Sequence, residues 1–322
     1  MQPKGLMNLG ATCYMNSLLQ CLRSCQSFRE LILSKMSREP NTKSLVWAMS
    51  DLFHRMDTEP NPVLRPAVFL HAMQCTFDYL NIRSQNDVHE IFMLIVARLN
   101  TELNTKAPLM ETPKKISPFF DKIKRKCDKS WSECISKEYS SLTDMLHGQM
   151  INQIICGNCN HIHHNYQMFS VWEVPIPSKK TNPTLEDCFS LSLESETLQE
   201  WRCDKCNKIS PSEKIMKIWK FPKILTICIK RFVHKNNRGS KMDHNINVPE
   251  VIDLYPLELS PENESLRYHI RATSNHMGSL NSGHYVALCR TDTEWICIDD
   301  AQRGIGSLKD AEQGYLLFYE RV

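Results

Sequence analysis

Apolar residues in the first third of the chain recur every three or four positions, which is the period of a helix that buries one face. The pattern predicts helices over residues 12–22, 45–56, 66–73 and 88–99. Thr12 can cap the first of these helices, and Pro66 can occupy the first turn of the third. We interpret all four apolar stripes as core packing.

The stretch from residue 104 to 140 breaks this pattern. It is crowded with lysine and arginine, contains three prolines and shows little periodicity. Such a composition is typical of a solvated, mobile insertion. A nuclear-import or nucleic-acid-binding patch is the second interpretation of the same charges.

After residue 142 the spacing of apolar residues falls to two, the period of a strand with one buried face. Helices early in the chain and strands later favour an α+β fold with a helical lobe beside a β lobe. The predicted strands cover residues 149–155, 163–174, 224–233, 268–274, 285–290, 295–298 and 315–320.

The overall composition is that of a globular protein, with 322 residues of which 42% are hydrophobic and 23% charged. The formal net charge of +3 is too close to balance for a protein that mainly coats nucleic acid or an anionic membrane. No apolar run reaches the roughly 18 residues of a membrane-spanning helix. Because the first residues offer no signal segment, we expect a cytoplasmic or nuclear protein.

The chain has 14 cysteines, which in a reducing compartment favours metal ligands, a reactive thiolate or buried thiols over disulfides. Four of them form two Cys-x-x-Cys pairs, at Cys156 and Cys159 and at Cys203 and Cys206. Four thiolates suit one structural, tetrahedral Zn²⁺ per chain. The alternatives are ordinary buried cysteines, a redox pair, or replacement of one thiolate by a neighbouring histidine, namely His161, His163 or His164.

A second chemical signal lies in the segment GLMNLGATCYMNS at residues 5–17. Cys13 falls in the first turn of the predicted helix, where the positive end of the helix dipole favours a thiolate. Asn8, on the irregular segment before it, can direct its amide toward an oxyanion near that sulfur. Taken alone, Cys13 fits a small core cysteine better than a nucleophile.

A nucleophilic cysteine needs a base and a group that orients the base. The sequence SGHY at residues 282–285 places His284 at the start of a predicted strand, directly before Tyr285. Asp299 and Asp300 end the strand WICI and can supply the orienting carboxylate. This ordered set is typical of cysteine proteases.

With these residues in view, the chain resembles the ubiquitin-specific protease family of deubiquitinases, which are cysteine peptidases. Residues 5–17 resemble the family's cysteine box, RSQNDVHE at 83–90 its glutamine-aspartate segment, and residues 268–285 with 295–300 its histidine box. The two cysteine pairs resemble its zinc-binding fingers, and IKRF at 229–232 its palm strand. The likeness extends over nearly the whole chain.

The resemblance implies a papain-like core forming one catalytic domain over residues 1–322. Its parts would be a helical thumb at about 5–147 with the basic insertion near 104–140, zinc-bearing β fingers at about 148–230, and a β palm at about 231–322. It also implies a ubiquitin or ubiquitin-like partner and a monomer, with no nucleic-acid or membrane partner.

The resemblance also implies roles for individual residues. Cys13 would be the nucleophile, His284 the general base and then acid, Asp299 its orienting partner with Asp300 as alternative, and Asn8 the oxyanion group. Gln85 would support the site, Asp87 and Glu90 would face the basic end of the bound modifier's tail, and Tyr285 would contact substrate. Asn86 and His89 stand where the family more often has glutamine.

Three functional hypotheses remain open on the sequence. The first is an isopeptidase that cleaves after the C-terminal Gly-Gly of ubiquitin or a relative; its variant is a deconjugase specific for the interferon-induced two-domain modifier. The second is a non-catalytic scaffold that binds the modifier, which the presence of Cys13, His284 and Asp299 disfavours. The third is a zinc-ribbon nucleic-acid module, which the near-neutral charge disfavours.

Overall fold

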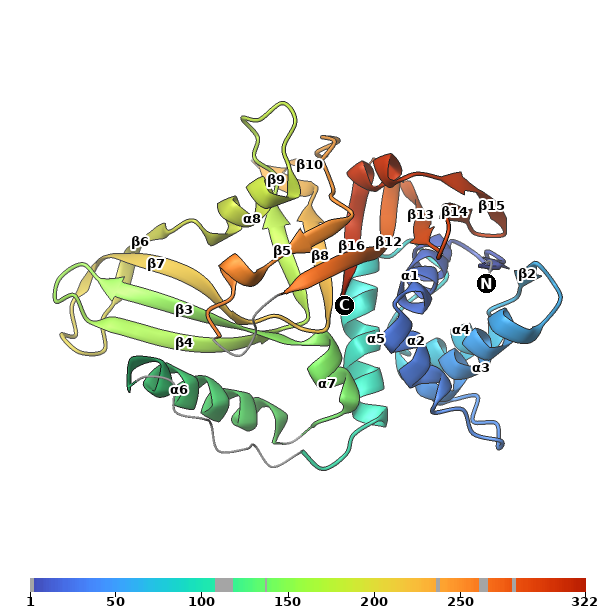
Figure 1. Ribbon diagram of the computed structural model, residues 1–322, viewed down its shortest axis with the longest axis horizontal. Coiled ribbons are helices and arrows are strands. Elements are labelled where there is room, and N and C mark those ends of the chain that lie inside the picture. Colours follow the sequence, from blue (N-terminus) through green and yellow to red (C-terminus); the bar gives the residue numbers. More distant parts are fainter. Residues whose placement is uncertain (1–2, 108–117, 137, 236–237, 261–265, 280–281) are drawn as a thin grey trace.

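The computed structural model describes residues 3–107, 118–136, 138–235, 238–260, 266–279 and 282–322. A lobe of helices lies at one end, a large sheet lies in the middle, and a second sheet projects away from the helices (Figure 1). This is the α+β arrangement that the hydrophobic pattern predicts. No described helix is both long and apolar enough to span a bilayer.

The four predicted helices are confirmed as α1 (Cys13–Ser24), α3 (Leu45–Thr58), α4 (Ala67–Thr76) and α5 (Val88–Glu102). The Ser44 hydroxyl caps α3 and the Asp87 carboxylate caps α5. The pattern did not predict α2 (Gln26–Leu33), α7 (Ser141–Leu146) or α8 (Leu185–Leu193), which span too few turns to show a clear period.

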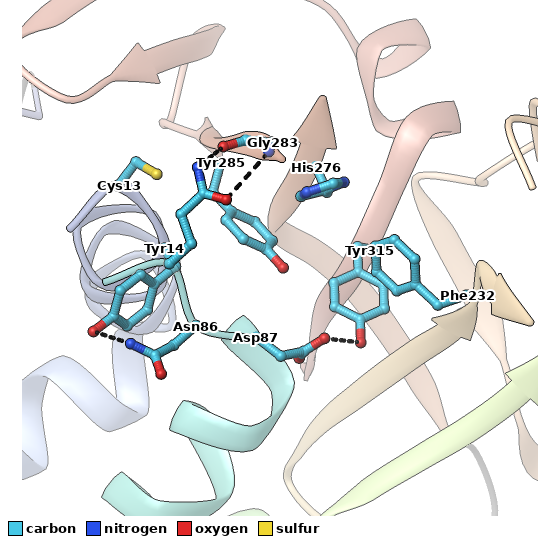
Figure 2. Close-up of a pocket in the computed structure, with 10 residues that line it drawn as sticks. Cys13, Tyr14, Asn86, Asp87, Phe232, His276, Gly283, Tyr285 and Tyr315 are labelled. Atoms are coloured by element: carbon cyan, nitrogen blue, oxygen red, sulfur yellow. Dashed lines mark hydrogen bonds between the residues drawn. The ribbon is translucent and has the colours of Figure 1, made fainter. Parts of the chain in front are cut away.

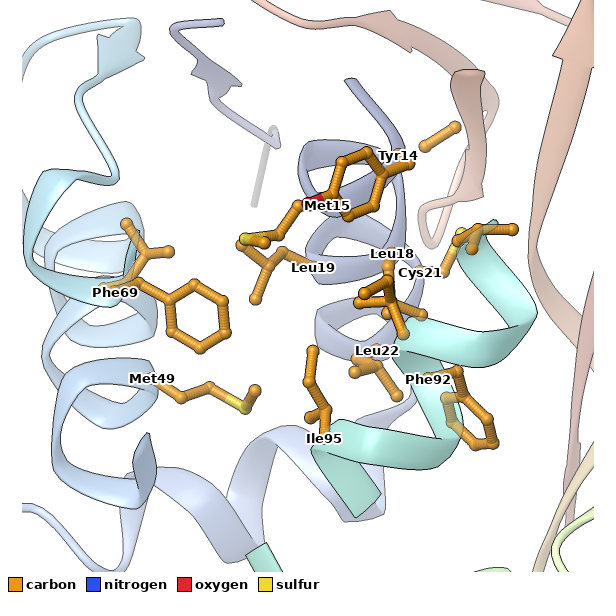
Figure 3. Packing of buried hydrophobic residues seen from close by; sticks show 14 of the residues in the cluster. Tyr14, Met15, Leu18, Leu19, Cys21, Leu22, Met49, Phe69, Phe92 and Ile95 are labelled. Atoms are coloured by element: carbon orange, nitrogen blue, oxygen red, sulfur yellow. The ribbon is translucent and has the colours of Figure 1, made fainter. Parts of the chain in front are cut away.

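Helix α1 lies at the centre of the helical lobe and is buried almost along its whole length. Its apolar side chains pack against residues of α3, α4 and α5, as the neighbours Met49, Phe69 and Phe92 in Figure 3 illustrate. On another face, Ser17 Oγ forms a 2.7 Å hydrogen bond to Ser274 Oγ of the central sheet. The helix that carries Cys13 is therefore fixed between the two lobes.

The central sheet has the strand order β15-β14-β13-β12-β16-β8-β5, with β11 paired to β12. All of its strand pairs are antiparallel except β5 with β8. The strands are β5 (Val171–Pro175), β8 (Ile224–Lys230), β11 (Val251–Asp253), β12 (Arg267–Gly278), β13 (Gly283–Arg290), β14 (Trp295–Asp299), β15 (Gln302–Gly306) and β16 (Gly314–Arg321).

The projecting sheet has the order β4-β3-β7-β6 and is antiparallel throughout. It consists of β3 (Gly148–Cys156), β4 (Ile162–Phe169), β6 (Glu196–Arg202) and β7 (Ile209–Lys220). Two short pairs complete the strands: the parallel β1 (Gly5–Leu6) with β2 (Val63–Leu64), and the antiparallel β9 (Phe232–Lys235) with β10 (Arg238–Lys241).

Two predicted strands are divided in the structure. The stretch 163–174 splits at Ser170 into β4, in the projecting sheet, and β5, in the central sheet. The stretch 224–233 splits at Arg231, whose buried guanidinium donates to the carbonyl oxygens of Gly314, Met242, His244 and Glu312. β5 and β8 thus belong to the central sheet, although both lie inside the range expected for the fingers.

The expectation of a mobile insertion over 104–140 is wrong for its described second half. Residues 118–135 form α6 (Pro118–Ile135), which lies along β4 (Figure 1). Ile123 and Cys127, four residues apart, pack against Ile151 and Trp219. Trp131, four residues further on, is also buried, and Lys220 Nζ lies over its ring. This narrow apolar stripe is hidden in the sequence by the lysines and arginines on the other faces. Residues 108–117 lie outside the described part.

Candidate active site

Cys13 is the first residue of α1 and lines a cavity of about 340 Å³. Its side chain is buried, with 4% exposed. Burial raises the pKa of the Cys13 thiol, the backbone N–H of Tyr285 lowers it in part, and the Asp300 carboxylate raises it again. The net pKa of the Cys13 thiol is above the ordinary value, because burial outweighs the backbone hydrogen bonds that lower it.

His284 and Asp299 come together at the ends of the neighbouring strands β13 and β14. His284 Nε2 lies 2.6 Å from Asp299 Oδ1, so the imidazole donates this hydrogen bond to the carboxylate and keeps Nδ1 free. The backbone N–H of Tyr285 faces the Cys13 sulfur. His284 is the residue directly before Tyr285 in the chain. No hydrogen bond joins His284 to Cys13, both of which the structure describes.

Asp300 contacts two asparagines rather than replacing Asp299. Its Oδ1 accepts from Asn16 Nδ2 at 2.7 Å and its Oδ2 accepts from Asn8 Nδ2 at 2.8 Å. It sits in the turn between β14 and β15 with a φ of 49°, in the left-handed region that aspartate tolerates better than most residues. Asp300 therefore connects this turn to the segment around Cys13.

Asn8 is held on both sides of its amide. While Nδ2 donates to Asp300, Oδ1 accepts from the backbone N–H groups of Gly10 and Thr12, each at 3.1 Å. The loop between these residues is tightly turned, with left-handed φ values of 109° at Gly10 and 48° at Ala11. One N–H of Asn8 stays available for an oxyanion near Cys13.

Gln85 contacts the strand that carries the histidine. Its Nε2 donates to the carbonyl oxygen of Gly283 at 2.9 Å, and its Oε1 accepts from the Gly283 N–H at 3.4 Å (Figure 2). Both polar groups of Gly283 are thus fixed directly before His284. Nearby, Asn86 donates to the Tyr14 hydroxyl at 3.2 Å, which joins this loop to α1.

Aromatic rings and one carboxylate form the far part of the cavity (Figure 2). Asp87 caps α5 with one oxygen, and its other oxygen accepts from the Tyr315 hydroxyl at 2.8 Å. Tyr285, predicted to contact substrate, lines the same cavity. Glu90 is exposed one turn further along α5 and does not line it.

The four predicted zinc ligands also come together, at the tip of the projecting sheet. The sulfur of Cys156 lies 3.9 Å from that of Cys206, and the sulfur of Cys159 lies 3.7 Å from that of Cys203. A tetrahedral Zn²⁺ with sulfur ligands at about 2.3 Å holds its sulfurs about 3.8 Å apart. The donor set and its spacing therefore fit one Zn²⁺ ion.

The two cysteine pairs have the same backbone turn. In each, an asparagine follows the second cysteine and adopts a left-handed φ, 54° at Asn160 and 55° at Asn207. The N–H of each asparagine donates to the carbonyl oxygen of the first cysteine of its pair. The histidines considered as alternative ligands lie outside this cluster, and His163 pairs instead with Asp204 at 3.2 Å.

Two residues of the site were not singled out in the sequence. Asn16 is a buried polar residue on an apolar helix, and this mismatch was the available signal for its role beside Asp300. Tyr315 is the first residue of a predicted strand, a position where an aromatic residue is unremarkable. Its hydrogen bond to Asp87 spans 228 positions. No local sequence pattern carries such a contact.

Comparison with known proteins gives a family match over residues 4–319, to the model described as ubiquitin carboxyl-terminal hydrolase. The chain is 29% identical to ubiquitin carboxyl-terminal hydrolase 21 of Rattus norvegicus, covering 98% of this chain and 61% of that protein. It is 27% identical to ubiquitin carboxyl-terminal hydrolase 4 of Saccharomyces cerevisiae, covering 99% of this chain and 39% of that protein. The chain spans about three fifths or less of the length of these curated relatives.

Among solved structures, the fold is similar to the SAGA DUB module Ubp8/Sgf11/Sus1/Sgf73 bound to monoubiquitin. The TM-score is 0.76 at 21% identity, over 100% of this chain and 71% of that chain. A second structure of the module, bound to ubiquitin aldehyde, gives a TM-score of 0.72 at 22% identity over 99% of this chain and 69% of that chain. These likenesses establish the fold.

Proposed function

Because this chain belongs to the ubiquitin carboxyl-terminal hydrolase family, we propose that it is a cysteine isopeptidase that removes ubiquitin or a ubiquitin-like modifier from proteins. It would cleave the bond after the C-terminal glycine of the modifier. We propose residues 1–322 as one catalytic domain, working as a monomer. We also propose that it works in the cytoplasm or the nucleus, where thiols such as that of Cys13 stay reduced.

The observation that carries this proposal is the His284–Asp299 hydrogen bond beside the Cys13 thiol. Nδ1 of His284 takes the proton of the sulfur as the sulfur attacks the carbonyl carbon of the terminal glycine. The imidazolium that forms is stabilised by Asp299 and then protonates the departing lysine amine. Water releases the modifier from the thioester in the reverse sequence of proton transfers.

The oxyanion of each tetrahedral intermediate would be stabilised by the free N–H of Asn8. Asp300 is a positioning residue in this scheme, because it holds Asn8 through the 2.8 Å hydrogen bond. Asp87 and Glu90 would face the basic tail of the modifier, and Tyr285 would contact that tail inside the cavity. In this scheme Asp299 orients His284 and Asp300 orients Asn8, each through one hydrogen bond.

Parallel cleavage assays test the substrate class. We expect the chain to release a reporter fused to the C-terminus of ubiquitin, because the names of its relatives specify ubiquitin. Cleavage of the fusion with the two-domain modifier alone would instead support the deconjugase alternative. Binding of either modifier without any cleavage would support the scaffold hypothesis and overturn the proposal.

Replacing Gln85 with alanine is expected to lower kcat/KM about 10-fold. The substitution frees the peptide group of Gly283, so His284 spends less time aligned, while an exposed side chain contributes little to stability. Steady-state hydrolysis of the ubiquitin reporter and a melting curve measure both effects. Gln26→Ala, which removes an exposed glutamine contact remote from Cys13, is the matched control. An unchanged kcat/KM would remove Gln85 from the site.

We also propose that one structural Zn²⁺ binds per chain, through Cys156, Cys159, Cys203 and Cys206. Serine at Cys206 is expected to lower the melting temperature by about 5 °C or more and to abolish stoichiometric zinc. Elemental analysis of purified protein and thermal denaturation measure the two effects. Cys134→Ser, at an exposed cysteine outside the cluster, is the control. Active wild-type protein without zinc would contradict the assignment.

A further inference from the structure

A second cavity lies beside the loop that leads to Cys13. It has a volume of about 290 Å³ and is lined by residues that include Leu9, Arg65, Leu70, His71 and Arg83. It shares none of its lining with the cavity in front of Cys13.

This second cavity borders the catalytic segment on two sides. Leu9 directly follows Asn8, and its N–H donates to the Thr12 hydroxyl at 3.0 Å. A Cβ placed on Gly10 would lie 3.8 Å from the Cβ of Arg83, so Arg83 runs alongside the turn before the nucleophile. The second cavity is therefore adjacent to the loop that precedes Cys13.

The backbone of both arginines is fixed. Arg65 directly follows β2, whose residues Val63 and Leu64 pair with β1. Arg83 lies in a loop where Asn86 donates to the carbonyl oxygens of Asn81 and Ser84. Both guanidinium groups are thus carried by anchored segments.

The charge of the second cavity is positive and uncompensated. The side chains of Arg65 and Arg83 are exposed, and neither has an ion pair or side-chain hydrogen bond within the described residues. By contrast, other arginines near carboxylates are paired, as Arg23 and Arg29 are with Asp57. No acidic residue lines the second cavity. Two free guanidinium groups in one hollow favour a carboxylate-rich ligand.

We propose that the second cavity binds acidic residues that flank the modified lysine in the protein from which the modifier is released. This inference rests on the isopeptidase function proposed above. The basic tail of the modifier suits the cavity that contains Asp87 and is repelled by Arg65 and Arg83. The leaving lysine and its neighbours must then lie on the other side of the bond, where the second cavity offers complementary charge.

The test uses two ubiquitin–peptide isopeptides as substrates. One carries two acidic residues on each side of the modified lysine, and the other carries their amide counterparts. For the wild-type chain we expect kcat/KM to be about 3- to 10-fold higher with the acidic peptide, which is the effect of two exposed ion pairs. The preference should shrink as the salt concentration rises from about 50 to about 500 mM, because added salt shortens the distance over which the charges attract.

The double variant Arg65→Gln, Arg83→Gln should bring the ratio of the two kcat/KM values close to one. Arg38→Gln, at another exposed arginine, should keep the wild-type ratio. Because each ratio is internal to one protein, a partial loss of folded enzyme cancels. If the double variant does not fold, the wild-type ratio and its salt dependence still decide the matter.

Equal cleavage of both peptides by the wild-type chain would overturn the acidic-ligand proposal and leave the isopeptidase function standing. Cleavage of neither peptide, nor of the ubiquitin reporter, would instead overturn the function itself. A preference that persists in the double variant would assign the acidic peptide to another surface and also contradict the inference.

Discussion

Replacing Cys13 with alanine is expected to reduce ubiquitin-reporter hydrolysis by about 10⁴-fold or more while the modifier still binds. The substitution removes the sulfur that forms the thioester, and no neighbouring side chain can replace it. Binding should persist because the carboxylate and aromatic rings of the cavity are unchanged. Steady-state hydrolysis and calorimetric titration with ubiquitin measure the two quantities on the same protein.

Cys75→Ala is the control for this experiment, since Cys75 is an exposed cysteine outside the Cys13 cavity and the zinc cluster. It should keep wild-type hydrolysis. Appreciable multiple turnover by the Cys13→Ala protein would mean that another residue is the nucleophile. Loss of ubiquitin binding together with hydrolysis would instead point to a folding defect, which a melting curve would reveal.

The second large effect is expected at Asp299. Alanine there should slow kcat by roughly 10²-fold or more, because His284 loses the 2.6 Å hydrogen bond that fixes the orientation of its ring. Asparagine at Asp299 can hold the ring but cannot stabilise its positive charge, so it should restore only part of the rate. Kinetics on both variants against the ubiquitin reporter measure this contribution.

Asp300 should behave differently from Asp299. Asp300→Asn keeps an acceptor for one asparagine and tolerates the left-handed φ, so we expect a loss of about 10-fold through a less firmly held Asn8. It also removes a charge that raises the pKa of the Cys13 thiol. The acidic limb of the pH–rate profile should therefore move to lower pH.

These two carboxylates can be assigned by comparing their variants. If Asp300→Asn costs more than Asp299→Ala, the orienting role belongs to Asp300 and the assignment of the third triad member is wrong. If each single change is mild and the double change severe, the two residues share the role.

Much of this site could be predicted because its chemistry is carried by residue types at short spacings. The Cys-x-x-Cys pairs and the helix that starts at Cys13 are local features, and both are present in the structure. The sequence also indicated that one of two adjacent acids would contact His284. The choice of Asp299 came from the family resemblance, and the hydrogen bond to His284 Nε2 is consistent with it.

What could not be predicted depends on contacts between distant segments. The pKa of Cys13 rises because β13 and the β14–β15 turn close over the helix terminus, and a local view of the helix dipole omits that burial. The division of 163–174 between two sheets has the same origin. The sequence shows no break at Ser170, and the two halves are separated only because they pair with strands of different sheets. Helix α6 was not predicted because its buried apolar face consists of only one residue per turn.

The measurement that tests the central claim most directly is reaction with ubiquitin bearing a C-terminal electrophile, followed by mass spectrometry of the adduct. Our account predicts one ubiquitin per chain, attached to the sulfur of Cys13 alone among the 14 cysteines, and no adduct with the Cys13→Ala protein. An adduct on another cysteine, or none on a folded chain that binds ubiquitin, would contradict it.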